Sequence, residues 1–343
     1  MKYEVTIGIP VYKAIDYIER TMESALNQTF ASIEYLIVDD YGNDGTINVI
    51  ERFQREHQRG KDIRILYNKQ NLGVGRTRNI ILEQARGDYL FFLDSDDIID
   101  SKAIEKMMFA AQKYQAQVVY GSWTRVDNVH HSPSQNNIYP SMQFFLPDEL
   151  AMYAFKNYSS FRISVCNALF SLNMIRLNHL RFLDTIYWED LVFTFDLVTY
   201  VDRAVLLSDI TYSYICRSNS LSHYQQRYSI SKEEILQNIK AIDHLKDTSS
   251  HLISKVYYPD RCYNIGMTNF YIACNILKHR KIIHPSFSNK EIKKLMSHPA
   301  TLQQIHSFRQ GRFFNYFLYL LGKLPPFLCV AMIWLAGKVK KTL

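Results

Sequence analysis

An acidic run, DSDD at positions 94–97, follows the apolar stretch 89–93. Asp94 and Asp96 are two residues apart at the end of a predicted strand, so both side chains can point the same way. Paired carboxylates supply the hard oxygen ligands that suit Mg²⁺ or Mn²⁺, and phosphate oxygens and water complete the octahedron. The run is also compatible with a solvated turn whose polar residues cap the next helix.

These acidic residues need a scaffold, and the first hundred residues alternate predicted strands and helices. The patterns predict strands at 5–9, 35–38, 63–66 and 89–93, and helices at 14–27, at about 46–57 and around 80–85. This alternation predicts a parallel sheet with right-handed crossovers. Ligands bind beyond the carboxyl ends of such strands, where Pro10, Asp39, Asp40 and the acidic run lie.

Two common phosphate-binding motifs are absent from the sequence. No GxGxxG follows the first predicted strand, and no GxxxxGK[ST] occurs anywhere. This argues against dinucleotide oxidoreductases and P-loop enzymes. Without such a cradle, carboxylates can hold a diphosphate only through a divalent cation.

The composition is that of a globular protein. The chain has 343 residues, of which 47% are hydrophobic and 21% are charged, and this length favours about two domains. The five cysteines are scattered and form no CxxC pair, which argues against zinc ribbons, thioredoxin-type sites and disulfide-stapled secreted folds. The N-terminal sequence has no secretory apolar region, so we expect no signal peptide and a reducing compartment.

The net charge of +7 is concentrated at one end of the chain. The last acidic residue is Glu291, and eight basic residues follow it, so the rest of the chain carries a net charge of −1. A nucleic-acid-binding protein would more often carry a basic stripe on its folded domain, so we expect no nucleic-acid partner. A basic end that is rich in bulky apolar residues indicates an anionic membrane surface instead.

The C-terminal segment 313–343 supports this interpretation. Its apolar part is split by Lys323 and two prolines, and the uninterrupted stretch 324–337 has 14 residues. A membrane-spanning helix needs about 20, so the segment predicts an interfacial helix whose Trp334 lies among the lipid headgroups. The alternative is a terminal helix that packs on the body of the protein or in a dimer.

Ordered segments over about two-thirds of the chain resemble the inverting nucleotide-sugar glycosyltransferases of family 2. These segments are VTIGIPVY (5–12), SALNQTF (24–30), YLIVDDYGNDGT (35–46), NLGVGRTRNIILEQARGDYLFFLDSDD (71–97) and WED (188–190). Each segment is weak alone, whereas their common order is specific. The resemblance implies an α/β fold of the GT-A (Rossmann-like) type, with a mostly parallel sheet, flanking helices and a helical C-terminal extension.

The resemblance also implies a nucleobase site. In it, Pro10, Tyr12 and Asp39 flank the base, and a carboxylate at Asp39 accepts a hydrogen bond from uracil N3–H. Lys13 stands where the family often has asparagine, and the turn at 39–42 reads DDYG instead of the common DDGS. Both departures bear on which nucleotide is used, and UDP is the expected one.

The diphosphate and the metal follow from the same resemblance. Arg78 is expected to approach the diphosphate, Asp94 to face the ribose and the metal shell, and Asp96 to bind Mn²⁺ or Mg²⁺. In the segment 214–224, Arg217 is expected to contact phosphate, and His223 to be a third metal ligand or a phosphate contact.

The apolar segment 188–201, WEDLVFTFDLVTYV, is predicted to be a helix that begins at Glu189 and Asp190. The resemblance implies that Asp190 is the general base, which takes the proton from the acceptor hydroxyl, and that Glu189 holds a sugar. The alternative is that Asp190 only caps its helix. Trp188 can stack on the acceptor sugar, although such a tryptophan is more often part of the core.

The expected domain organisation has three parts. These are a GT-A domain at 1–225, with a nucleotide-sugar half at 1–100 and an acceptor half at 101–225, a helical extension at 226–312, and a basic amphipathic membrane-associating tail at 313–343.

Together these features predict a metal-dependent inverting glycosyltransferase at the cytoplasmic face of the cell membrane. We expect a nucleotide-sugar donor, a saccharide acceptor that is lipid-linked, and a role in surface polysaccharide biosynthesis. A nucleotidyltransferase is an alternative, but such enzymes usually have a glycine-rich basic loop near the N-terminus, and GIPVYKA (8–14) has a single glycine. A non-catalytic nucleotide-sugar-binding scaffold is another alternative, and Asp190 would distinguish it.

Overall fold

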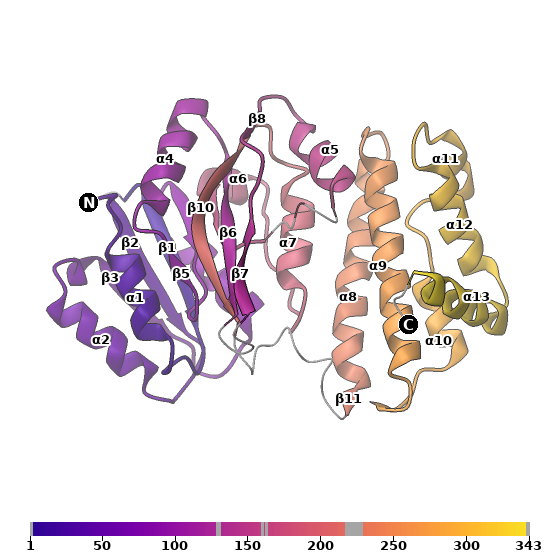
Figure 1. Cartoon of the computed structure of the whole chain (residues 1–343), viewed down its shortest axis with the longest axis horizontal. Helices are drawn as coiled ribbons and strands as arrows, with labels where there is room; N and C mark the ends of the chain where they lie inside the picture. Colours follow the sequence, from indigo (N-terminus) through magenta and orange to yellow (C-terminus); the bar gives the residue numbers. More distant parts are fainter. Residues whose placement is uncertain (1–2, 128–131, 159–160, 162–163, 217–228, 341–343) are drawn as a thin grey trace. The chain divides into compact units, whose positions relative to one another are not determined.

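The structure is a computed structural model, and it describes residues 3–127, 132–158, 161, 164–216 and 229–340 (Figure 1). The chain divides into two compact units. The first consists of residues 1–150, 163–184 and 189–220, and the second of residues 151–162, 185–188 and 221–343. The second unit therefore takes two short segments from within the sequence of the first.

The first unit is built on a mixed sheet with the strand order β3-β2-β1-β4-β9-β6-β10-β5. The strands are β1 (Val5–Val11), β2 (Ile33–Asp39), β3 (Ile63–Tyr67), β4 (Tyr89–Phe92), β5 (Ile98–Ile99), β6 (Val118–Asp127), β7 (Ser132–Asn137), β8 (Met142–Phe144), β9 (Ala168–Ser171) and β10 (Ala204–Cys216). Strands β1 to β4 pair in parallel, whereas β9 runs antiparallel to both β4 and β6. The predicted α/β fold is confirmed, with four parallel strands in the N-terminal half and a further parallel pair, β6 with β10.

The parallel strands are the hydrophobic centre of this unit. Every residue of β1 and β2 is buried, as expected for parallel strands that are covered on both faces. Because the four strands run in the same direction, Val11, Asp39, Tyr67 and Phe92 end at the same edge of the sheet. The loops that leave this edge carry the predicted donor site.

Helices flank the sheet of the first unit. They are α1 (Ile18–Leu26), α2 (Thr46–Glu56), α3 (Val74–Gln84), α4 (Ala103–Tyr114), α6 (Leu172–Leu177) and α7 (Glu189–Leu197), with a 3₁₀ turn η1 (Gly60–Asp62). Their apolar faces join the core, as Ile18 and Met22 of α1 and Met107 of α4 do. Helix α5 (Glu149–Lys156) begins in the first unit and continues in the second.

The second unit is almost entirely helical in its described part. It contains α8 (Lys232–Thr248), η3 (Ser249–Leu252), α9 (Tyr258–Lys278), α10 (Asn289–Leu295), α11 (Leu302–Ser307), α12 (Arg312–Lys323) and α13 (Pro326–Val339), with the short strands β11 (Ile230–Ser231) and β12 (Ile283–His284). Side chains that include Tyr258, Ile305 and Phe308 form a local core. Helix α12 packs on α9, and α13 packs on α9 and α10. Within the described residues, no helix has the length and apolar character needed to cross a bilayer.

Candidate active site

The loops after β1 and β2 are tied together at the carboxyl edge of the sheet. Ala14 N donates to Thr46 Oγ1 over 3.1 Å, which links the two loops. Lys13 and Tyr41 have φ angles of 48° and 64°, in the left-handed region. This conformation costs energy for residues other than glycine, and it persists only where the surroundings hold it. Tyr12, which is 46% exposed, therefore lies on a fixed pair of loops.

Asp39 is the last residue of β2, and its carboxyl group is buried. Its Oδ1 accepts a hydrogen bond from Gly42 N over 3.1 Å. Burial is the main cause that raises the pKa of Asp39 above its usual value. Tyr67 pairs with Asp39 across the strands and is 57% exposed, so it presents an aromatic ring beside this carboxyl group. Tyr67 was not predicted from the sequence, although its place at the end of a predicted strand is a usable signal.

The neighbouring Asp40 has a structural function. Its Oδ1 accepts hydrogen bonds from Leu72 N and Asn68 Nδ2, both at 2.8 Å, and its Oδ2 accepts from Gly73 N at 2.8 Å. Gly73 is the N-cap of α3 and has a φ of 85°, which favours glycine. Asp40 thus fixes the position at which α3 begins.

Arg78 of α3 connects two carboxylates that are far apart in the sequence. Its Nη2 donates to Asp94 Oδ1 over 2.8 Å, and its Nη1 donates to Glu189 Oε1 over 2.7 Å. The Arg78 side chain is 6% exposed. Burial alone would lower the pKa of Arg78, but Asp94 and Glu189 raise it above its usual value. The guanidinium is therefore permanently charged and holds both carboxylates in place.

The acidic run 94–97 lies in a turn beyond β4, which ends at Phe92. Asp94 and Asp96 are partly exposed, whereas Asp97 is buried. Asp97 Oδ2 accepts from Tyr212 Oη over 2.6 Å, and its Oδ1 accepts from Ile215 N over 2.8 Å. Asp97 therefore anchors the turn to β10, and the other two acids remain at the surface of the site.

Glu189 and Asp190 form the first turn of α7, as predicted. Glu189 is buried, and burial together with the charge of Asp190 raises its pKa to about 7, against the opposing effect of Arg78. Asp190 is partly exposed, and its Oδ1 accepts from Leu191 N over 2.7 Å. Among the described residues its Oδ2 has no hydrogen-bond partner. This oxygen can therefore accept a further hydrogen bond.

Helix α3 also fixes the segment that leads into α7. Asn79 Nδ2 donates to Phe182 O and Asn79 Oδ1 accepts from Phe182 N, both over 2.9 Å. A Cβ at Gly75 would lie 2.8 Å from Leu183 O, so only glycine allows this close approach. The Phe182 ring stacks on Phe193 of α7 with centroids 4.2 Å apart. This clamp was not predicted from the sequence, because it depends on contacts about a hundred residues apart.

Three further residues were predicted to belong to the site. Trp188 directly precedes α7, is partly buried, and has a left-handed φ of 64°. It belongs to the second unit. Arg217 and His223 lie outside the residues that the structure describes.

Asp94 and Asp96 are the carboxylates from which a divalent cation would take ligands at this turn. In the described part of the chain, no group of three or more His, Cys, Asp or Glu side chains is arranged to hold a metal ion. Two carboxylates fit a cation that takes most of its ligands from phosphate and water. The negative charges of Asp94 and Asp96 raise the pKa of Asp97 well above its usual value, after the larger effect of burial. Such crowding of acids favours a cation at this point.

Cys166 is a neighbour of this acidic group. The residue as a whole is partly exposed, but its thiol group is buried. This burial, and then the charge of Asp94, raise the pKa of the Cys166 thiol well above its usual value. The thiol is therefore protonated and unreactive at neutral pH.

A comparison with known sequences identifies the N-terminal half of the chain. Residues 6–176 match the family described as "Glycosyl transferase family 2". The chain is 25% identical over 223 residues to "Glycosyltransferase GlyG" of Streptococcus pneumoniae. This alignment covers 63% of this chain and 72% of that protein. It is 38% identical over 104 residues to the "Putative teichuronic acid biosynthesis glycosyltransferase TuaG" of Bacillus subtilis. That alignment covers 30% of this chain and 40% of that protein.

A solved structure resembles the whole fold. Residues 1–349 of S. aureus TarS, in complex with UDP-GlcNAc, align with a TM-score of 0.63 and 16% sequence identity. The alignment covers 93% of this chain and 90% of that chain. At this identity the likeness concerns the fold.

Proposed function

This chain belongs to glycosyltransferase family 2 and has the GT-A fold, and from that premise we propose that it transfers a sugar, with inversion, from a nucleotide-sugar to a hydroxyl group of a saccharide acceptor. The observation that supports this most is the double ion pair of Arg78. It brings Asp94, at the predicted donor site, and Glu189, beside the predicted base, to the two ends of one guanidinium group.

The donor is proposed to be a UDP-sugar. Pro10 and Tyr12 would flank the nucleobase, and Asp39 would accept a hydrogen bond from uracil N3–H. Gly42 N occupies one side of Asp39 Oδ1, which fixes the orientation of the carboxyl group. The complex of TarS with UDP-GlcNAc supports a uridine nucleotide in a fold of this kind.

A divalent cation, Mn²⁺ or Mg²⁺, is proposed to be held by Asp96 with Asp94 beside it. When bound, such an ion offsets the negative charge that develops on the departing nucleoside diphosphate. Arg78 Nη2 donates to Asp94 Oδ1 and so fixes the orientation of this carboxyl group. Arg217 is proposed as a phosphate contact, and His223 as a further metal or phosphate contact.

Asp190 is proposed to be the general base. Its carboxylate takes the proton of the acceptor hydroxyl as the oxygen attacks the anomeric carbon, the bond from that carbon to the diphosphate oxygen breaks, and the nucleoside diphosphate leaves. Attack from the opposite face inverts the anomeric centre. Glu189, held by Arg78, is proposed to bind a sugar hydroxyl, and Trp188 to stack on the acceptor.

The acceptor is proposed to be a lipid-linked saccharide at the cytoplasmic face of the cell membrane. The similarity to a putative teichuronic acid glycosyltransferase supports a role in surface polysaccharide biosynthesis. The basic C-terminal end supports the membrane setting. We further propose that residues 1–225 form the catalytic domain, with the donor half at 1–100 and the acceptor half at 101–225, that 226–312 form a helical extension, and that 313–343 associate with the membrane.

The decisive experiment separates donor binding from transfer. We expect Asp190→Asn to reduce transfer by about 10²–10⁴-fold, the range for loss of a general base, while UDP binding measured by calorimetry is unchanged. Asp184→Asn is the matched control, because Asp184 is an exposed acid that pairs with Arg76. Unchanged turnover in Asp190→Asn would refute the assignment of the base.

The metal assignment is tested by the same calorimetry. UDP, GDP and dTDP are titrated with and without Mn²⁺ into the wild type and into Asp96→Ala. We expect metal-dependent binding of UDP that is lost in Asp96→Ala. Metal-independent binding, or equal binding in the variant, would show that the acidic run is only a turn.

A further inference from the structure

Helix α13 presents an apolar surface that nothing in the described chain covers. It is buried only along the narrow stripe of Cys329, Ile333 and Gly337, at spacings of four residues. Most of its other large apolar side chains are exposed, with Phe327 at 64% and Leu335 at 53%, whereas Val330 is half-buried. A helix that is apolar on all sides is normally buried on all sides. The exposed apolar part of α13 is therefore typical of a surface that binds another molecule or a membrane.

Helix α12, which precedes it, has a second exposed apolar face. Phe313, Phe317 and Leu320 follow helical spacing and are exposed, Phe313 to 77%. The opposite face is fixed to α9, where Asn315 Nδ2 donates to Pro259 O over 3.2 Å. The exposed face is thus held rigidly outward, and it is not a frayed end.

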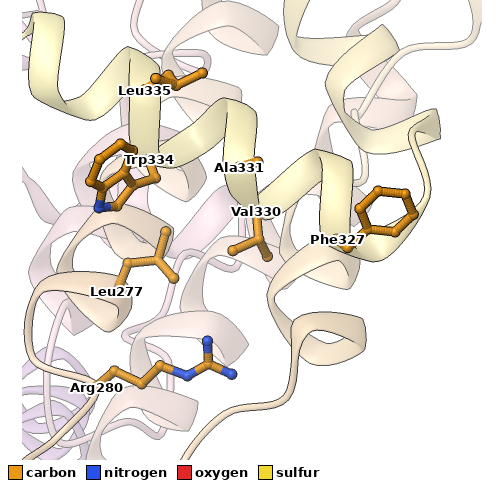
Figure 2. Close-up of a pocket in the computed structure, with 7 residues that line it drawn as sticks. All are labelled: Leu277, Arg280, Phe327, Val330, Ala331, Trp334 and Leu335. Atoms are coloured by element: carbon orange, nitrogen blue, oxygen red, sulfur yellow. The ribbon is translucent and has the colours of Figure 1, made fainter.

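An open groove of about 510 Å³ runs along α13. It is lined by Phe327, Val330, Ala331, Trp334 and Leu335 of α13 and by Leu277 and Arg280. Figure 2 shows Val330 and Trp334 pointing toward Leu277, with Arg280 beyond it. Arg280 is the one charged residue among these seven, and its Nη2 is held by Phe287 O at 3.1 Å.

The charged side chains that α12 and α13 themselves carry are all basic. No acidic residue follows Glu291 in the sequence. Exposed basic side chains accompany the apolar ones at Lys323 and Lys338, and Lys338 Nζ lies 3.8 Å from the centre of the Trp334 ring. Exposed aromatic rings with flanking lysines are the composition of an interfacial membrane helix.

We propose that α12 and α13 form a docking surface for an anionic phospholipid bilayer. The exposed rings and aliphatic chains enter the boundary between headgroups and acyl chains, the groove along α13 takes part of an acyl chain, and the lysines contact lipid phosphates. Helix α13 has 14 residues and lies in the interface, because it is too short to span the bilayer. The inference deepens the membrane setting of the proposed function and rests on that setting alone.

Charge complementarity favours a lipid surface over a second copy of the chain. In a two-fold symmetric dimer the same patch lies on both partners. Such a dimer would bring the lysines of α12 and α13 against one another, and neither helix carries an acid to neutralise them. An anionic bilayer supplies the missing negative charge, and each basic residue near its surface strengthens binding by about fivefold.

The test is flotation of the full chain with vesicles of phosphatidylcholine, either pure or mixed with phosphatidylglycerol. We expect the chain to bind the anionic vesicles, to bind pure phosphatidylcholine much more weakly, and to be released by high salt. Brominated lipid should quench the fluorescence of Trp334, because its ring lies at the headgroup boundary.

Two pairs of variants localise the surface. We expect Phe327→Ser with Trp334→Ser to lose at least about tenfold in vesicle binding, since two apolar side chains no longer insert. The control is Phe109→Ser on α4, which removes an aromatic ring that is 66% exposed elsewhere. We expect Lys338→Gln with Lys340→Gln to weaken binding by about 25-fold at low salt. Lys102→Gln with Lys113→Gln, two exposed lysines of the first unit, is its control.

Several results would overturn the proposal. They are equal binding to neutral and anionic vesicles, equal losses in the control variants, or concentration-dependent dimerisation that Phe327→Ser with Trp334→Ser abolishes without any vesicle binding by the wild type. UDP binding with Mn²⁺ is measured on every variant. Vesicle binding without UDP binding would refute the proposed function and leave the docking surface intact, and the reverse result would refute only the surface.

Discussion

Arg78 shows how one side chain organises the chemistry of the site. Ion pairs with two carboxylates offset the free-energy cost of burying its guanidinium. One carboxylate comes from the turn after β4 and the other from the start of α7. Two residues earlier on the same helix, Arg76 pairs with Asp184 at the surface. The two arginines therefore allow a comparison of a buried ion pair and an exposed one on a single helix.

We expect Arg78→Met to lower the free energy of unfolding by about 3–5 kcal/mol, because it leaves two carboxylates without their counter-charge. Arg76→Met is the control and should leave the unfolding free energy nearly unchanged, since exposed ion pairs contribute little. The measurement is urea denaturation of both variants and the wild type. Equal losses in the two variants would contradict the role assigned to the buried pair.

Glu189 predicts a specific pH dependence of stability. Its pKa is raised from 4.5 to about 7 in the folded protein. Between these values the folded chain retains a proton that the unfolded chain has lost, so stability falls as the pH rises through this window. We expect Glu189→Gln to remove this fall, which amounts to about 1–3 kcal/mol. Denaturation of wild type and variant at about pH 5 and pH 8 measures the difference, and parallel pH profiles would disprove the shift.

The sequence indicated Asp39, Asp94, Asp96, Glu189 and Asp190 because acidic residues at strand and helix ends are visible in one dimension. It did not distinguish exposed acids from structural ones. Asp40 and Asp97 look identical to their neighbours in the sequence, yet the three-dimensional structure turns both toward backbone amides. The assignment of catalytic and metal roles within this set remains a prediction.

At the scale of elements, the first four strands were predicted to within two residues at each end. Their apolar runs are continuous because parallel strands are buried on both faces. Strand β9 was not predicted, because its four residues carry no periodicity that separates them from a loop or a helix. The reversal of direction at β9 is decided by pairing with β4 and β6, which are about 80 and 50 residues away in the sequence.

The coupling of α3 to α7 makes a prediction at this scale. Asn79 holds Phe182, and Phe182 stacks on Phe193 of α7. We expect Asn79→Ala to misplace the helix that carries Asp190, so that kcat falls about tenfold or more while UDP binding is retained. Asn48→Ala, an exposed asparagine on α2, is the control and should leave both quantities unchanged. A loss of UDP binding in Asn79→Ala would contradict the expected separation.

At the scale of the whole molecule, the described residues of the predicted donor site and the basic end of the chain belong to different units. The sequence showed this separation as a body with a net charge of −1 and a tail with eight basic residues. The structure assigns α12 and α13 to the helical second unit, where they pack on α9. It therefore confirms packing on the body, which the sequence left open, and it leaves an apolar face outward for the proposed membrane contact.

Hydrogen exchange tests whether the nucleotide and the membrane contact different units of the chain. We expect UDP with Mn²⁺ to slow exchange in the loops after β1, β2 and β4, and to leave α8 to α13 unchanged, because the predicted donor residues described in the structure all lie in the first unit. Anionic vesicles should give the opposite pattern, with protection confined to α12 and α13. Asp96→Ala should lose the first pattern and keep the second. Protection of α12 by the nucleotide alone would refute the separation.

The position of β9 between β4 and β6 has a consequence for the chain while it is being synthesised. When the ribosome has completed β4 at Phe92, the partner of its free edge ends only at Ser171, which is 79 residues later. At a synthesis rate of about 5–20 residues per second, this edge stays unpaired for about 4–16 s. During that time the nascent chain exposes the apolar sequence YLFF as an open strand edge, the kind of surface on which neighbouring chains aggregate. The edge of β4 is therefore open to aggregation until the strand that covers it has been synthesised.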